Sequence, residues 1–213
     1  MIYPARKQSL RSAMGVVVMT VALGLATGCS PDSQPASNST ATGATAAASH
    51  YADPSIAPGQ ISLTSSDFSD GDQLPDWSTA DAWGGQCTGE NDNPELSWTG
   101  APEGTTAFAL TMVDTTAEFA HWAQANIPAS DSSVPRGTSA QIEGIVGSNS
   151  TGDDGYFGPC PPSGTHEYQF TVWALDATVD VSPGMAYDQL IAAMDGHVLA
   201  SSTLTGLRTA NDS

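Results

Sequence analysis

One aspartate and two histidines have the side chains and spacing that acid–base or anion-binding chemistry could use. Asp114 ends an apolar segment, His121 follows seven residues later, and His166 ends a loop rich in glycine and proline. An imidazole donates or accepts a hydrogen bond and titrates near neutral pH, and a carboxylate can orient it. The three residues could therefore form a general acid–base set or part of an anion site. Spacing alone leaves surface or internally bonded histidines as the alternative.

The motifs of the common enzyme classes are absent from the sequence. It contains no GxSxG elbow, no P-loop, no GxGxxG and no recognisable activated nucleophile. The acidic stretch from Asp67 to Asp72 lacks the spacing of a calcium-binding EF-hand loop, and no cysteine–histidine cluster has zinc spacing. We therefore expect a protein that is not an enzyme and that needs no metal or cofactor. A small-molecule hydrolase using Asp114 and the two histidines is the less favoured alternative.

Short apolar segments predict the strands that would carry these residues. The runs at 107–113 and 167–174 are rich in β-branched and aromatic residues and are bounded by turn signals, as in the core of a sandwich. Apolar residues at helical spacing, followed by a glycine, predict one helix near 185–194. The expected fold is mainly β, with one or two helices late in the chain. Weaker strand candidates lie at 61–68, 95–99 and 121–127.

The first thirty residues have the features of an export signal. Arg6, Lys7 and Arg11 precede an apolar stretch, residues 12–26, that is short for a membrane-spanning helix. Small residues then precede Cys29, which resembles a bacterial lipobox; an ordinary secretory signal is the alternative. We expect cleavage before Cys29, its lipidation, and a location outside the cytoplasm in the bacterial cell envelope, anchored to a membrane by lipid.

The composition divides the chain into three parts. Residues 1–28 are the predicted signal peptide. Residues 29–58 consist mostly of Ser, Thr, Ala, Pro and Gly, a composition that cannot bury enough apolar surface to fold, so we expect a flexible tether. Residues 59–213 remain as one globular domain.

Two cysteines remain once Cys29 is lipidated, namely Cys87 and Cys160. Cysteines outside the cytoplasm tend to be oxidised in pairs. We therefore expect a disulfide between them, with two separate buried thiols as the alternative.

The charge balance excludes several classes of partner. The 213 residues carry 23 acidic and five basic side chains, a net charge of −18, and only Arg136 and Arg208 are basic beyond Cys29. Binding to nucleic acid or to anionic lipid headgroups needs a basic surface. We expect no nucleic-acid partner, and membrane contact through the N-terminal lipid only.

Several short motifs follow one another in a recognisable order between residues 61 and 209. Asp70-Gly71 comes first, then NPELSWTGAPEGT from Asn93, HWAQANIP from His121 and GYFGPCPPSGTHEYQF from Gly155, and finally a tail from Gly196. In this order the segments resemble the phosphatidylethanolamine-binding protein family, most of all its bacterial Raf-kinase-inhibitor-like (YbhB/YbcL-type) branch. The resemblance covers nearly all of the predicted domain.

The resemblance implies a two-sheet antiparallel Greek-key sandwich with C-terminal helices and a small surface cavity. It implies a regulatory, non-catalytic domain whose cavity binds a phosphate-type or other polar ligand. Inhibition of a secreted protease or of another protein partner is the alternative function. The ligand-binding residues carried over from the family are Asp114, His121, Gly158, Pro159, Cys160, Pro161, His166 and Tyr168.

Two departures from the family pattern lie beside this site. The residues from Asp114 to Glu118 read DTTAE where the family has DPDAP, and Glu167 stands where the family has arginine. The first change alters the rim of the cavity, and the glutamate makes the surroundings more negative, which disfavours a free dianion. We therefore expect weak phosphate binding, or a zwitterionic or neutral polar ligand. His197 is interpreted as a structural residue that forms a local hydrogen bond.

Overall fold

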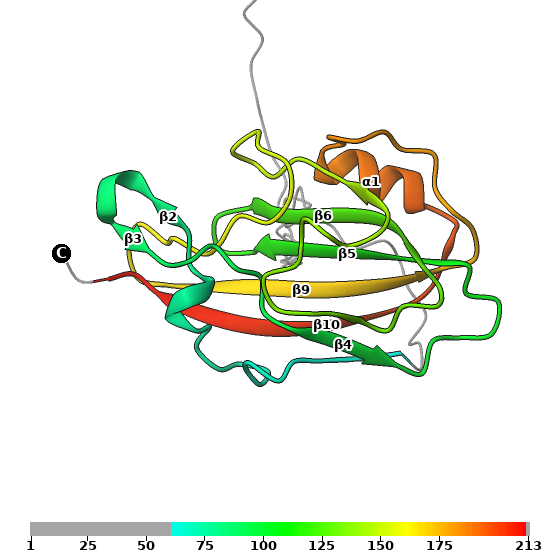
Figure 1. The fold of residues 1–213 in the computed structure, drawn as a ribbon, viewed down its shortest axis with the longest axis horizontal. Coiled ribbons are helices and arrows are strands. Elements are labelled where there is room, and N and C mark those ends of the chain that lie inside the picture. Colours follow the sequence, from blue (N-terminus) through cyan, green and yellow to red (C-terminus); the bar gives the residue numbers. More distant parts are fainter. Residues whose placement is uncertain (1–60, 212–213) are drawn as a thin grey trace, which may run out of the picture. The chain divides into compact units, whose positions relative to one another are not determined.

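Continuous apolar runs place the longest strands in one five-stranded antiparallel sheet (Figure 1). The computed structural model describes residues 61–211. The order of the strands in this sheet is β10-β9-β5-β6-β8. Every residue of the central strand β5 is buried, as expected for a strand with neighbours on both sides and packing on both faces. The strands are β5 (Ala107–Asp114), β6 (Phe119–Pro128), β8 (Ile145–Val146), β9 (Thr165–Leu175) and β10 (Val198–Thr209).

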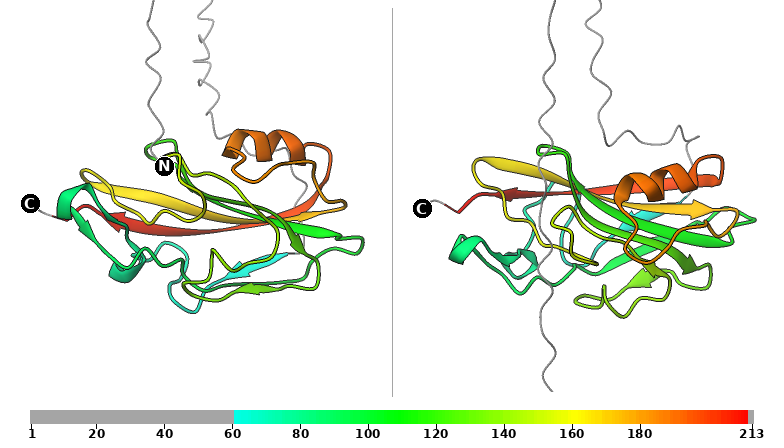
Figure 2. Two further views of the ribbon diagram at one scale, coloured as in Figure 1. Left: turned by 45° about the horizontal axis from the view of Figure 1, so that its top comes forward. Right: turned by 90° about the horizontal axis from the view of Figure 1, so that it is seen from above.

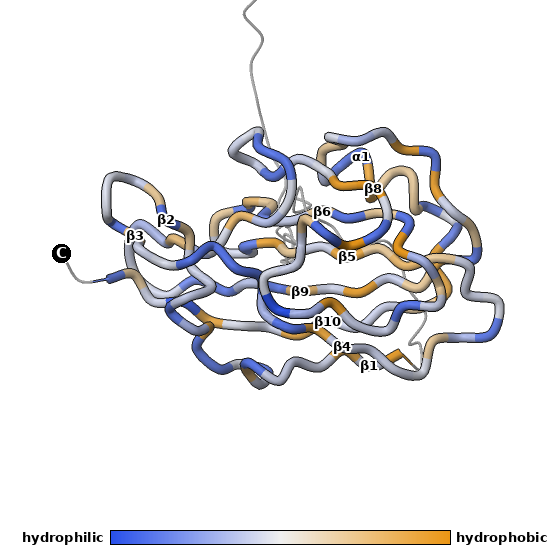
Figure 3. Tube along the Cα trace, viewed as in Figure 1, coloured by the Kyte–Doolittle hydropathy of each residue, from blue (hydrophilic) through white to orange (hydrophobic). Residues whose placement is uncertain are grey.

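A second, three-stranded sheet forms the other layer of a sandwich, as Figure 2 shows. It contains β1 (Ser62–Thr64), β4 (Leu96–Thr99) and β7 (Ser133–Val134), in the order β1-β4-β7. Large apolar side chains of both sheets form one buried cluster. Hydrophobic segments lie along β1, β4 and β5, and also on β8 and α1 (Figure 3). Burying each such side chain stabilises the fold by about 1.5–3 kcal/mol. The cluster includes Leu63, Leu96, Trp98, Phe108, Leu110, Met112, Trp122, Phe170 and Val172.

A small two-stranded ribbon lies at one end of the sandwich (Figure 1). It consists of β2 (Asp81–Ala82) and β3 (Cys87–Thr88), joined by the 3-10 helix η2 (Trp83–Gly85). Another 3-10 helix, η1 (Asp76–Ser78), precedes it. A disulfide between Cys87 and Cys160, whose Cα atoms are 5.9 Å apart, ties the ribbon to the loop that leads into β9. This is the cysteine pair favoured by the sequence analysis.

The helix α1 (Tyr187–Met194) covers the outer face of the five-stranded sheet (Figure 2). Leu190 and Met194 pack there in one cluster with Ala109, Ala123 and Trp173. The alanines leave room for the helix to lie close to the strands. The helix predicted near 185–194 is therefore confirmed, and it is the one α-helix within residues 61–211.

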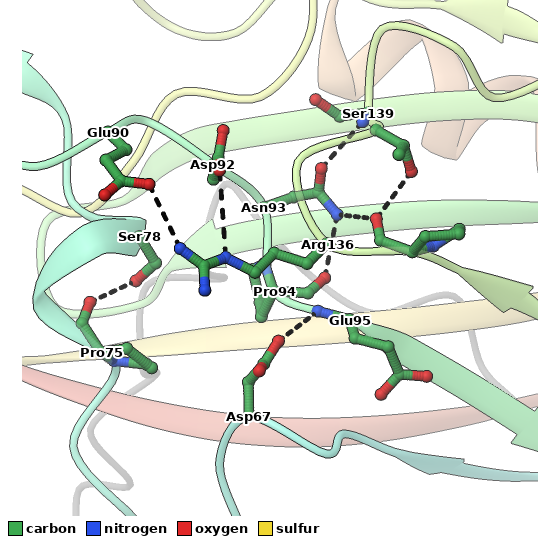
Figure 4. Close-up of polar contacts among 12 residues, drawn as sticks. Asp67, Pro75, Ser78, Glu90, Asp92, Asn93, Pro94, Glu95, Arg136 and Ser139 are labelled. Carbon is green, nitrogen blue, oxygen red and sulfur yellow. Dashed lines mark hydrogen bonds and ion pairs between the residues drawn. The ribbon is translucent and has the colours of Figure 1, made fainter.

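The fold confirms a mainly β antiparallel sandwich, with the ribbon as a small third sheet. The strongest strand predictions, 107–113 and 167–174, correspond to β5 and β9. The candidate at 61–68 yields only the three-residue β1. The chain turns after β1 because polar side chains bond to Glu95, the residue just before β4. Ser65 Oγ donates to Glu95 O at 2.6 Å. Asp67 Oδ2 accepts from Glu95 N at 2.7 Å, as Figure 4 shows.

Several predictions fall outside the described residues. The signal peptide 1–28, the lipidation of Cys29 and the tether 29–58 all lie before residue 61. Within residues 61–211, no helix is both long and apolar enough to cross a membrane.

Candidate ligand-binding site

Three neighbouring strands bring polar side chains together at one end of the five-stranded sheet. Asp114, the last residue of β5, pairs with Phe119 at the start of β6 and with Tyr168 near the start of β9. His166 lies two residues before Tyr168 and therefore points to the same face of β9. His121 lies two residues after Phe119, and their rings are 4.7 Å apart. Antiparallel pairing thus brings Asp114 and His121 together with His166 and Tyr168, a pair that lies about 50 residues further along the chain.

These side chains line a cavity of about 260 Å³ that opens to the surface. Its walls come from the ends of β5, β6 and β9, from the loop before β9, and from the ribbon. Apolar and aromatic groups make up most of the wall, with a few polar groups among them. The lining residues are Trp83, Gln86, Asp114, Ala117, Phe119, His121, Phe157, Cys160, Pro161, Pro162, His166 and Tyr168.

Asp114 holds the turn after β5 and orients one histidine. One carboxylate oxygen, Oδ1, accepts backbone hydrogen bonds from Thr116 at 2.9 Å and from Ala117 at 3.0 Å. The other, Oδ2, accepts from Nδ1 of His166 at 2.6 Å. Since the hydrogen of His166 Nδ1 is used in this bond, its Nε2 remains for contact with a ligand.

His121 is held as a neutral imidazole by its surroundings. It is the extra residue of a β-bulge, because Ala120 and Trp122 pair with consecutive residues of β5, and bulges commonly re-aim a side chain beside a site. Its Nδ1 donates to the backbone oxygen of Phe157 at 2.6 Å. Burial lowers the pKa of His121 to about 4, against the opposing effects of that carbonyl and of the Asp114 charge. At neutral pH its Nε2 is therefore a hydrogen-bond acceptor.

Tyr168 places a hydroxyl at the cavity without a protein partner. Its side chain is fully buried, and its hydroxyl makes no hydrogen bond of standard length and angle with the described residues, although the Asp114 carboxylate interacts with it. Burial, together with the negative charge of Asp114, raises the pKa of Tyr168 well above its usual value. The hydroxyl therefore stays protonated and can donate to a ligand.

Comparisons with known proteins show which family shares this sequence and fold. The family model for the phosphatidylethanolamine-binding proteins matches residues 64–209. The chain belongs to this family. It is 34% identical over 158 residues to the UPF0098 protein YbhB of Escherichia coli, covering 69% of this chain and 99% of YbhB. A UPF0098 protein of Methanothermobacter thermautotrophicus is 40% identical over 128 residues, covering 57% of this chain and 85% of the relative.

Solved structures of the phosphatidylethanolamine-binding protein family share the fold. The crystal structure of Escherichia coli YbcL, described as a new member of the mammalian PEBP family, superposes with a TM-score of 0.67 at 30% identity. The superposition covers 72% of this chain and all of YbcL. A PEBP homologue from Chlamydia trachomatis, CT736, gives a TM-score of 0.63, also at 30% identity, over 72% of this chain and 99% of its own.

Six of the eight residues carried over from the family line the cavity: Asp114, His121, Cys160, Pro161, His166 and Tyr168. We expected Gly158 and Pro159 there as well. They instead pack against residues 78–80, the segment that leads into the ribbon. A Cβ on Gly158 would lie 2.3 Å from the backbone oxygen of Ser78, and Pro159 O accepts from Ala80 N at 3.3 Å. These two residues therefore position the loop and are not part of the cavity wall.

The altered segment after Asp114 still forms a turn held by Asp114, which accepts hydrogen bonds from the amides of Thr116 and Ala117. Glu167 alternates with His166 and Tyr168 along β9 and is exposed, and it is not part of the cavity wall. Its negative charge therefore acts from outside. His197 also lies outside the cavity, where its Nδ1 pairs with Asp176 Oδ1 at 2.9 Å.

Sequence reasoning missed part of the aromatic wall. Phe157 lies inside a recognised motif, and Phe119 alternates with His121, so both carried a usable signal. Trp83 had almost no sequence signal, because it lies between the matched segments. Only the expected disulfide at Cys87, four residues later, indicated that this part of the chain lies near the site. Residues 61–211 contain no group of three or more His, Cys, Asp or Glu side chains that could hold a metal ion.

Proposed function

We propose that this chain is a non-catalytic binding protein that takes a small polar or phosphate-type ligand in the cavity between Asp114, His121, His166 and Tyr168. The observation that carries the proposal is the hydroxyl of Tyr168, which is buried at the cavity and has no hydrogen-bond partner among the described residues. A buried polar group without a partner costs about 1–3 kcal/mol. A bound ligand that accepts this hydrogen bond offsets that cost.

The other polar groups of the cavity support the same proposal. Nε2 of His121 is an acceptor, and Nε2 of His166 is left over from the bond to Asp114. Few polar groups among apolar walls are typical of small-molecule sites, whose volumes run from about 300 Å³ upward. A volume of about 260 Å³ suits a small molecule or the headgroup of a larger one.

The chemistry of the wall favours binding over catalysis. Among the lining residues there is no serine, threonine or lysine, and the sulfur of Cys160 is bonded to Cys87. The pair of Asp114 and His166 could orient a base, but no serine, threonine, lysine or free cysteine lies in the wall for it to activate. An inhibitory action on a secreted protease stays a prediction from the family resemblance.

The proposed location is the bacterial cell envelope, outside the cytoplasm, with lipid on Cys29. It is supported by the lipobox-like sequence before Cys29 and by the disulfide, a bond that persists in oxidising compartments. Labelling cells with a radioactive fatty acid tests the anchor. The label should enter the wild-type chain and be absent from Cys29→Ser; label retained in that variant would contradict the proposal.

The binding proposal is tested by removing the hydroxyl oxygen of Tyr168. In Tyr168→Phe we expect affinity for phosphoethanolamine, measured by isothermal titration calorimetry, to fall about 2- to 10-fold, the worth of one hydrogen bond. The free energy of unfolding should stay equal or rise, because the deleted hydroxyl has no protein partner among the described residues.

Tyr156→Phe is the matched control, since Tyr156 donates its hydroxyl to Ser78 O at 3.0 Å and is not part of the cavity wall. It should lose stability, by about 1–3 kcal/mol, and keep its affinity. Unchanged affinity in Tyr168→Phe, or no binding by the wild type, would contradict the proposed function.

A further inference from the structure

A second, smaller cavity lies on the outer face of the five-stranded sheet, where α1 begins. Figure 2 shows α1 over one end of that face. This outer cavity has a volume of about 100 Å³. Its wall residues on β5 and β9 alternate with Asp114 and Tyr168, so the two cavities lie on opposite faces of the same strands. The outer cavity is lined by Thr111, Val113, Thr115, Gln169, Thr171, Trp173 and Tyr187.

The floor of the outer cavity is polar although it is buried. Thr111 and Thr171 are paired across β5 and β9, and they are only 2% and 6% exposed. Further along the same face, the positions under α1 are apolar, among them Ala109, Ala123 and Trp173. Packing alone favours valine at the two threonine positions, because valine has the same shape and buries no hydroxyl group. The two hydroxyl groups therefore form a polar patch that packing of the sheet does not require.

The polar groups of the outer cavity keep hydrogen-bonding capacity for a ligand. Thr111 Oγ1 accepts from Nε1 of Trp173 at 3.1 Å, so its own hydrogen remains to be donated. Thr171 Oγ1 shares one hydrogen bond with Thr203 Oγ1 at 2.9 Å and keeps a lone pair. Gln169 is half-buried, and its side-chain amide forms no hydrogen bond with the residues that the structure describes. The wall thus offers both donors and acceptors.

No charged side chain is among the residues that line the outer cavity. This is notable in a chain with 23 acidic and five basic residues. A wall without charge gives no advantage to an anion or a cation. Tyr187 and Val113 add apolar surface beside the hydroxyl and amide groups. The combination suits a neutral molecule that has many hydroxyl groups and a short carbon skeleton.

We propose that the outer cavity binds a neutral polyhydroxy compound, whose hydroxyl groups bond to Thr111, Gln169 and Thr171 and whose carbon skeleton packs against Tyr187. A hydroxyl group donates and accepts at once, which matches this mixed set of partners. The volume suits a molecule of the size of glycerol or one edge of a sugar ring that extends into solvent. The site is separate from the cavity of the proposed function and does not depend on it.

The test is an NMR titration of the full chain with methyl glucoside, glycerol and 1-propanol. The amide signals of residues 111, 169 and 171 should shift with the first two probes, with millimolar dissociation constants. 1-Propanol has the three carbons of glycerol but a single hydroxyl group, and it should cause no shift. Tighter binding of methyl glucoside would identify a sugar residue as the ligand, and tighter binding of glycerol a free polyol.

Variants test the roles of the wall residues. Gln169→Leu and Thr171→Val should each weaken binding of methyl glucoside by about 2- to 10-fold, the worth of one hydrogen bond. Thr205→Val is the matched control and should keep the affinity, because Thr205 pairs with Gln169 across β9 and β10 but does not line the cavity. Tyr168→Phe changes only the first cavity and should keep it as well.

Three results would overturn the proposal. They are equal shifts with 1-propanol, an affinity that Gln169→Leu and Thr171→Val leave unchanged, and no shift with methyl glucoside at about 100 mM, far above a millimolar dissociation constant. None of them bears on the proposed function, which is measured with phosphoethanolamine at the other cavity. Failure of one proposal is therefore distinguishable from failure of the other.

Discussion

At the scale of single residues, Asp114 connects the stability of the domain to its site. The carboxylate is buried, and it accepts hydrogen bonds from two backbone amides and from His166. We expect Asp114→Ala to lower the free energy of unfolding by about 3 kcal/mol, because three buried donors lose their acceptor. Asp114→Asn keeps an oxygen for the two amides and should cost roughly half as much. Urea denaturation measures both; equal stability of the two variants would contradict this role.

The lowered pKa of His121 makes the free energy of unfolding depend on pH. The folded protein keeps the pKa of this histidine near 4, below its ordinary 6.5, so between these values the unfolded chain binds more protons. Stability is therefore fully present above about pH 6.5 and is lost as the pH falls toward 4. This single group contributes a slope of up to about 1.4 kcal/mol per pH unit.

Free energies of unfolding measured from pH 8 to pH 5 check this prediction. His121→Gln can still donate to Phe157 O but does not titrate, so its stability should fall less steeply with acid than that of the wild type. Other groups titrate alike in both proteins and cancel in the difference. Parallel curves would show that the histidine is not held neutral.

At the scale of elements, the ribbon depends on its disulfide more than on its pairing. Strands β2 and β3 share only two residue pairs, whereas the disulfide closes a separation of 73 residues. Replacing Cys87 and Cys160 by serine should lower the free energy of unfolding by about 4 kcal/mol, from the loop-closure relation. Amide exchange in residues 81–88 should accelerate. Cys29→Ser is the control and should change neither quantity; a ribbon equally protected without the disulfide would contradict this account.

The sequence predicts a strand correctly where the strand's own composition is apolar enough to identify it. β5 and β9 are apolar enough to be recognised alone. β10 is the longest strand, yet the sequence analysis misses it, because it is rich in serine and threonine and buries only Ala200, Leu204 and Gly206. Its pairing with β9 supplies the structure that its own composition does not indicate.

The site residues, too, can be predicted only where the local sequence carries a signal. Asp114, His121, His166 and Tyr168 belong to motifs of the family, so the resemblance alone is enough to predict that they share one cavity. Trp83 reaches the cavity only through a disulfide and a short ribbon without periodic pattern. A residue brought to a site by such a tertiary link has no local signature in the sequence.

At the scale of the whole molecule, the excess of acidic side chains opposes folding. The chain carries 23 acidic and five basic residues, and mutual repulsion destabilises a compact state. Added salt screens that repulsion. The melting temperature should therefore rise as sodium chloride increases from about 0.01 M to about 0.5 M, and potassium chloride should act alike. A melting temperature that falls or stays constant would show that local ion pairs dominate.

The central claim is that the cavity at the end of the five-stranded sheet binds a ligand. Histidine-resolved NMR of the full chain, titrated with phosphoethanolamine, tests it most directly because this probe carries both an ammonium and a phosphate group. His121 and His166 line the cavity, whereas His197 lies outside it beside Asp176. The account predicts shifts of the His121 and His166 signals, with the His197 signal unchanged. No shift at millimolar probe, or an equal shift of His197, would contradict it.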